Sequence, residues 1–187
     1  KIDKIFSLLE DQIKNIFSNS EIFDIFKHNK RILLFLIDKK YITIDDTITE
    51  YLINKYCHFF YPEIKSKLDE EKMRKIESEL FEGTIDLNAF EENRRKGENN
   101  SHLCYLIRND LVEDFIVFVN KTNLNLTNKI NSSVFETNSF LIDKEPTIIE
   151  YAAFFGSIQI FNFLKFNNAP LNSSLWLYAI HSKKPEL

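Results

Sequence analysis

A tandem pattern in the second half of the chain constrains its fold more than any other feature. Three segments open with Ser or Thr and carry Tyr four positions later, at Tyr105, Tyr151 and Tyr178. A hydroxyl residue at the start of an apolar stretch is typical of a helix N-cap. One such segment cannot bury its apolar face alone, so we expect the segments to stack on one another. The segments, which start near residues 101, 147 and 174, read SHLCYLIRNDLVEDFIVFV, TIIEYAAFFGSIQIFNFLK and SLWLYAIHSKKPEL.

The first two segments each predict a pair of helices joined by a tight turn. Gly156 lies where that turn requires a positive φ, and Asp110 occupies the matching place in the first segment. Glycine adopts this conformation without steric cost, and Asp tolerates it better than most residues. Ala152 and Ala153 are small enough for a neighbouring helix to approach closely. We therefore expect left-handed backbone at both turn positions.

The first half of the chain is predicted to be helical without a clear repeat. An apolar stripe at steps of three and four runs from Ile2 to Phe17. Pro62 is expected to break or kink the chain, and Gly83 to end a helix. Capping boxes, in which a hydroxyl residue precedes an acidic residue by three positions, predict further helix starts at Ser18–Glu21, Thr47–Glu50 and Ser66–Asp69.

A polar stretch around residues 84–100, containing Gly97, is the best candidate for an internal boundary. We expect an N-terminal helical region over 1–97 and the repeat segments over 98–187. Only three Gly and four Pro occur in 187 residues, which disfavours an all-β sandwich and excludes a Gly-rich phosphate loop. The predicted fold class is all-α.

Composition narrows the functional classes. The net charge is −4, and no basic stripe predicts nucleic-acid binding. No apolar run approaches the ~20 residues of a membrane helix, so we expect no membrane insertion. Cys57 and Cys104 do not form a disulfide framework, which favours reduced thiols and a cytoplasmic location.

Candidate chemistry is sparse. Cys57 and His58 are adjacent, but no paired Cys or His spacing typical of zinc is present, so we expect no metal and no cofactor. The acidic pair Glu91 and Glu92 is expected to be solvated. The basic run 94–96 fits the C-terminal end of a helix dipole, with a phosphate site as the alternative. No nucleophile and base are evident together, so we predict that the protein is not an enzyme.

The segment TIIEYAAFFGSIQIFNFLKFNNAPLN resembles one ankyrin repeat. It departs from the family pattern at Ile148, which replaces Pro, and at Glu150, which replaces His. The resemblance implies a helical solenoid in which the usual His–Thr hydrogen bonds between repeats are missing or replaced. Longer strings, including KHNKRILLFLI and SLWLYAIHS, resemble protist proteins with degenerate ankyrin repeats and a domain of unknown function. The residues that match the ankyrin pattern are Thr147, Ala152, Ala153, Gly156, Ile158, Leu164, Ala169 and Asn172.

The long connection from Thr122 to Pro146 is the preferred contact region, because long loops in compact domains often carry function. Its proposed partner-binding residues are Phe135, Glu136, Asn138 and Phe140. In the alternative, Phe135, Phe140 and Leu141 fold back to cover the gap between segments.

The sequence therefore predicts a non-catalytic protein–protein interaction module of ankyrin type. The alternative is a structural or regulatory fragment of a larger repeat protein with no partner of its own. The third segment stops at Leu187 before a second helix is complete, which predicts self-association through that end. Trp176 aligns with Ile149 and is expected in the core rather than at an interface.

Overall fold

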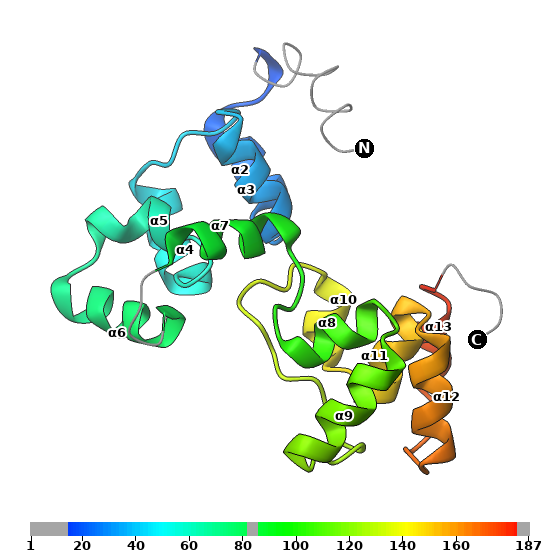
Figure 1. Cartoon of the computed structure of the whole chain (residues 1–187). Coiled ribbons are helices and arrows are strands. Elements are labelled where there is room, and N and C mark those ends of the chain that lie inside the picture. Colours follow the sequence, from blue (N-terminus) through cyan, green and yellow to red (C-terminus); the bar gives the residue numbers. More distant parts are fainter. Residues whose placement is uncertain (1–14, 82–85, 183–187) are drawn as a thin grey trace. The chain divides into compact units, whose positions relative to one another are not determined.

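The computed structural model describes residues 15–81 and 86–182. It divides the chain into two compact units, Lys1–Gly97 and Glu98–Leu187, which we call the N-terminal unit and the C-terminal unit and describe separately. The described residues contain helices and no strand, with a helix content of 64% (Figure 1). The protein is therefore all-α, as the sequence predicts. Gly83 and almost all of the stripe from Ile2 to Phe17 lie outside the described residues.

The N-terminal unit is a set of short helices around an aromatic and aliphatic core. Phe59 and Phe60, in the turn before α5, and Tyr61, the first residue of α5, are fully buried, and Leu36 and Leu52 are equally inaccessible. Its helices are α2 (Asn19–Phe26), α3 (Lys30–Asp38), α4 (Asp46–Tyr56), α5 (Tyr61–Ile64), the 3₁₀ turn η1 (Lys65–Lys67), α6 (Glu70–Phe81) and α7 (Leu87–Lys96).

Only one of the three capping boxes predicted in this unit forms. Ser18 and Glu21 exchange the two hydrogen bonds expected at the start of α2. The prediction at Thr47 is wrong, because Asp45 caps α4 by accepting from the Ile48 N–H at 2.9 Å. An Asp side chain reaches the same backbone donor as Ser or Thr, so a carboxylate nearer the true helix start takes the cap.

The remaining predicted box, Ser66–Asp69, is also wrong. Asp69 itself caps α6, accepting from the Lys72 N–H at 2.8 Å, while Ser66 lies in the preceding 3₁₀ turn. Pro62 does not interrupt a helix but lies in the first turn of α5. Proline is tolerated there because a backbone N–H in the first turn has no acceptor within the helix.

The C-terminal unit contains two helix pairs whose corresponding helices touch. Helix α8 packs against α9, and α11 packs against α12; between the pairs, α8 contacts α11 and α9 contacts α12. A further helix, α13, packs against α11. These elements appear in green to red in Figure 1. Their bounds are α8 (His102–Arg108), α9 (Val112–Thr122), α10 (Ser139–Lys144), α11 (Ile148–Phe155), α12 (Ile158–Phe166) and α13 (Leu175–Ala179).

Both turns predicted inside the helix pairs have left-handed backbone. The φ angle is 51° at Asp110 and 68° at Gly156, which confirms the prediction. Ala152 and Ala153 are fully buried on α11, where α8, α12 and α13 all approach. Small side chains at these positions permit that close packing.

The three tyrosines do not occupy equivalent environments, contrary to the sequence alignment. Tyr151 and Tyr178 are 1% and 3% exposed, whereas Tyr105 is 51% exposed. Trp176, expected in the core, is 62% exposed. The reason is position in the row α8–α11–α13. Tyr151 is on the middle helix, which is covered on both sides, whereas Tyr105 and Trp176 are on outer helices, each with a side that no other helix of the row covers. Tyr178, although also on the outer helix α13, belongs to the buried core and contacts the Phe140 ring of α10.

Candidate functional site

Polar side chains join the two helix pairs of the C-terminal unit. Asp110, in the turn of the first pair, accepts hydrogen bonds from the backbone N–H groups of Gln159 and Ile160 at 3.2 and 3.0 Å. These donors lie in the first turn of α12, where a negative charge is also favoured by the helix dipole. The Ser157 hydroxyl donates to the Ile107 carbonyl at 2.5 Å. Residues of one pair therefore complete the backbone hydrogen bonding of the other.

Glu150 connects the second segment to the third. Its carboxylate accepts from the Thr147 N–H at 2.8 Å and from the Thr147 hydroxyl at 2.9 Å. The other carboxylate oxygen accepts from the Ser174 hydroxyl at 2.5 Å, and the residue is only 5% exposed. Glu150 thus places a buried carboxylate between these groups. It joins the opening hydroxyl residues of two successive segments.

Arg108 forms a third connection. Its guanidinium donates to the Asn99 carbonyl at 2.8 Å and to the Tyr151 hydroxyl at 3.0 Å, and it is 3.1 Å from the Glu98 carboxylate. Burial raises the pKa of Tyr151 far above the ordinary value, so its hydroxyl stays neutral. Arg108 therefore joins the start of the C-terminal unit to the second helix pair.

The residues predicted to bind a partner largely stabilise the connection itself. Glu136 is 7% exposed and accepts from the backbone N–H groups of Asn99 and Asn138 at 3.2 and 2.9 Å. Asn138 is exposed and caps α10 by accepting from the Phe140 N–H at 3.1 Å. Phe135 is 8% exposed. Of these three side chains, Asn138 is the exposed one, and a role of these residues in partner binding stays a prediction.

Phe140 belongs to an aromatic cluster over the second and third segments. Its ring stacks on Phe154 at 5.9 Å between centroids and lies 5.1 Å from Tyr178 and 4.5 Å from His181. Leu141, beside it, is 5% exposed and belongs to the core of the unit. For Phe140 and Leu141, this placement agrees with the alternative that the connection folds back over the segments.

The basic run near the end of α7 does not form one cluster. Arg94 is 2% exposed and makes two hydrogen bonds to the Glu63 carboxylate, at 2.7 and 2.8 Å. It also donates to the Phe59 carbonyl at 3.0 Å, and its guanidinium lies 5.7 Å from the Phe59 ring centroid. A bidentate pair of this kind fixes both side chains in one geometry. Arg94 is therefore part of the fold, which leaves Arg95 and Lys96 as the only solvent-facing cations of the run.

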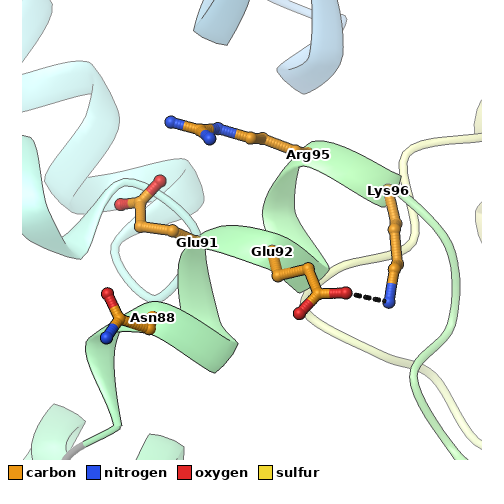
Figure 2. A pocket seen from close by; sticks show the side chains of 5 residues that line it. All are labelled: Asn88, Glu91, Glu92, Arg95 and Lys96. Carbon is orange, nitrogen blue, oxygen red and sulfur yellow. Dashed lines mark ion pairs between the residues drawn. The ribbon is translucent and has the colours of Figure 1, made fainter.

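A groove of about 490 Å³ lies along the exposed side of α7 (Figure 2). Figure 2 shows that Lys96 turns back toward Glu92, and the two groups form an ion pair at 2.6 Å. The groove carries equal numbers of acidic and basic side chains, so it offers no net positive charge to a phosphate. Its lining residues are Asn88, Glu91, Glu92, Arg95 and Lys96.

One arrangement was not predicted from the sequence. The Cys57 sulfur is 3.2 Å from Nδ1 of His58, and Nε2 of the same ring is 2.5 Å from the Glu79 carboxylate. The adjacent Cys and His are visible in the sequence, but they lie in the turn after α4, whereas Glu79 lies 21 residues beyond His58, on α6. No local spacing indicates that pairing. Within 15–81 and 86–182, no three side chains of metal-binding type are arranged to hold an ion.

Comparisons with known proteins give no match, so a proposal for the function rests on the geometry of the structure. No family model, curated protein or solved structure matches the chain. Among the helices that the structure describes, none has the length and apolar character needed to span a membrane.

Proposed function

We propose that the C-terminal unit is a non-catalytic protein-interaction module built from degenerate ankyrin-type repeats, acting in the cytoplasm. The observation that carries this proposal is the contact of α8 with α11 and of α9 with α12. Tandem helix pairs with like helices in contact are the arrangement of repeat proteins, which bind partners over extended surfaces.

The polar connections support the same proposal. In a repeat array each unit contacts its neighbours, so side chains that cross from one unit to the next are expected. Asp110 and Glu150 do so between successive segments. Glu150 provides a chemical replacement for the His that the ankyrin pattern would place there, because its two oxygens accept from the opening hydroxyl groups of both segments.

The exposed aromatic residues indicate where a partner would bind. Tyr105 on α8 and Trp176 on α13 are more than half exposed, and Ile180 beyond α13 is 67% exposed. Tyr and Trp are enriched among residues that anchor protein interfaces. We therefore propose a protein partner with an apolar segment rather than a nucleic acid, in keeping with the chain's net charge of −4.

A second candidate is a structural role, in which another copy of the chain or further helices of the same protein cover the outer side of α13. The exposure of Trp176 and Ile180 favours it, because these two residues are one helical turn apart and together form an apolar strip. Self-association of the chain, measured by sedimentation against concentration, would distinguish this role from binding to a different protein.

The test uses the whole chain as bait in an extract of its native cells, followed by measurement of Kd for each captured protein. Tyr105→Ser and Trp176→Ser are the test variants. Val117→Ser is the control. Val117 is 64% exposed, but it lies on α9, outside the row α8–α11–α13 that carries Tyr105 and Trp176. We expect at least a tenfold loss of affinity in a test variant and none in the control, with unchanged helix content. Equal affinity for all variants would overturn the proposal.

A further inference from the structure

We propose that Cys57, His58 and Glu79 form an activated-thiol site, at which Cys57 is covalently modified by small electrophiles. The site lies in the N-terminal unit and is independent of the interaction function proposed above. Cys57 follows the last residue of α4, His58 is its neighbour, and Glu79 lies on α6. The three side chains form an unbroken series of hydrogen-bonding groups, with distances of 3.2 Å from sulfur to Nδ1 and 2.5 Å from Nε2 to the carboxylate.

The contact with Glu79 orients the imidazole for this role. A carboxylate accepts hydrogen bonds, so the neutral His58 ring carries its proton on Nε2 and leaves the Nδ1 lone pair facing the Cys57 sulfur. If the thiol proton moves to Nδ1, both ring N–H groups have an anionic acceptor, the thiolate on one side and the carboxylate on the other. A nucleophile beside a base that is itself oriented by a third group is the general arrangement of activated nucleophiles.

Access to the sulfur separates Cys57 from the other cysteine. Cys57 is partly exposed, whereas Cys104 is completely buried. Burial raises the pKa of the Cys104 thiol, which disfavours its reactive anion. The His58 and Glu79 side chains are 32% and 46% exposed, so a small reagent can approach from solvent. The chain therefore contains its own unreactive reference thiol.

The reaction is a substitution at carbon. With iodoacetamide, the Cys57 sulfur forms a bond to the CH₂ carbon, the carbon–iodine bond breaks, and iodide leaves with the bonding pair. The thiol proton passes to Nδ1 of His58 and then to solvent, so no oxidant or reductant is required. A metal ion does not fit the same residues, because the two ring nitrogens face opposite partners and cannot both bind one ion.

The experiment measures the second-order rate of alkylation of each cysteine by iodoacetamide, using peptide mapping of the whole chain at pH 6. The native protein is compared with the same protein in urea, where both thiols are ordinary. We expect native Cys57 to react at least tenfold faster than it does in urea, because an ordinary thiol is almost entirely protonated at pH 6. Cys104 should react only in urea.

Three variants test the roles of the neighbours. His58→Gln should reduce the native Cys57 rate at least tenfold, and Glu79→Gln should reduce it about threefold through loss of ring orientation. Glu71→Gln, an exposed change on the same helix, should leave the rate unchanged. Native Cys57 reacting no faster than in urea, or a His58→Gln rate equal to wild type, would overturn the proposal. The native-against-urea comparison decides the matter even if a variant does not fold.

Discussion

The two units hold their helices together by different means. In the described part of the N-terminal unit, the ion pair Arg94–Glu63, whose side chains are 2% and 15% exposed, ties α7 to α5. Further polar contacts join its other helices, such as the Tyr61 hydroxyl on α5 to the Glu77 carboxylate on α6. In the C-terminal unit, Asp110, Glu150 and Arg108 each connect one segment to another. The contrast lies in the kind of contact: the N-terminal unit has two opposite charges buried against each other, whereas the C-terminal unit joins its segments mainly by charged side chains bonded to backbone groups and hydroxyls. Removing one partner of the buried charge pair should therefore cost more stability than removing any one of the segment connections.

The largest effect is expected at Arg94. Arg94→Ala leaves the Glu63 carboxylate, 15% exposed, without its two hydrogen bonds. Loss of one partner of a buried ion pair costs about 3–5 kcal/mol. The free energy of unfolding in urea measures it, with the exposed neighbour Arg95→Ala as the control. Equal losses in the two variants would show that the ion pair does not hold the unit together.

The next effect is expected at Glu150. Glu150→Ala leaves the Thr147 N–H and the Ser174 hydroxyl without their acceptor in a buried site. A buried polar group without a partner costs about 1–3 kcal/mol. Urea unfolding of this variant should show that loss, while the exposed change Glu113→Gln on α9 should stay within about 0.5 kcal/mol of wild type. If Glu150→Ala leaves the free energy of unfolding unchanged, Glu150 does not stabilise a connection between the second and third segments.

A smaller effect is expected at Asp110, which combines a helix cap with left-handed backbone. Asp110→Ala should cost about 1 kcal/mol through loss of the hydrogen bonds to the start of α12. It should lose additional stability because Ala is strained at the positive φ of 51°. Asp110→Gly removes the cap but relaxes the backbone, so it should be less destabilising than Asp110→Ala. Thermal unfolding followed by circular dichroism gives the order. If the two variants are equally stable, the left-handed backbone at this turn has no effect on the difference in stability between Ala and Gly.

The smallest change in the free energy of unfolding is expected at two tyrosines that the sequence aligns, Tyr151 and Tyr105. Tyr151→Phe removes the hydroxyl to which Arg108 donates and should cost about 1 kcal/mol. Tyr105→Phe alters an exposed ring and should change the free energy of unfolding by less than about 0.5 kcal/mol. Matched urea titrations test the pair. Equal losses would restore the equivalence that the alignment predicts.

Local sequence rules succeeded where the signal and its structural consequence lie within one helical turn. Ser18–Glu21 forms the predicted capping box, and Thr147 is the N-cap of α11, as predicted for the hydroxyl residue that opens its segment, because each side chain and its backbone partner are three residues apart. The rule failed at Thr47, where nearby Asp45 offered an equally good cap. It did not extend to Glu79, whose partner His58 lies on a different part of the chain.

The sequence by itself determined that the chain is helical and that its turns at Asp110 and Gly156 are left-handed. These properties depend on side-chain size and on backbone sterics within a few residues. Tertiary structure alone decided that Tyr151 is buried and Tyr105 exposed, and that Arg94 pairs with Glu63. Burial depends on which helices lie on each side of a residue, and similar segments meet different neighbours in the middle and at the edge of a row.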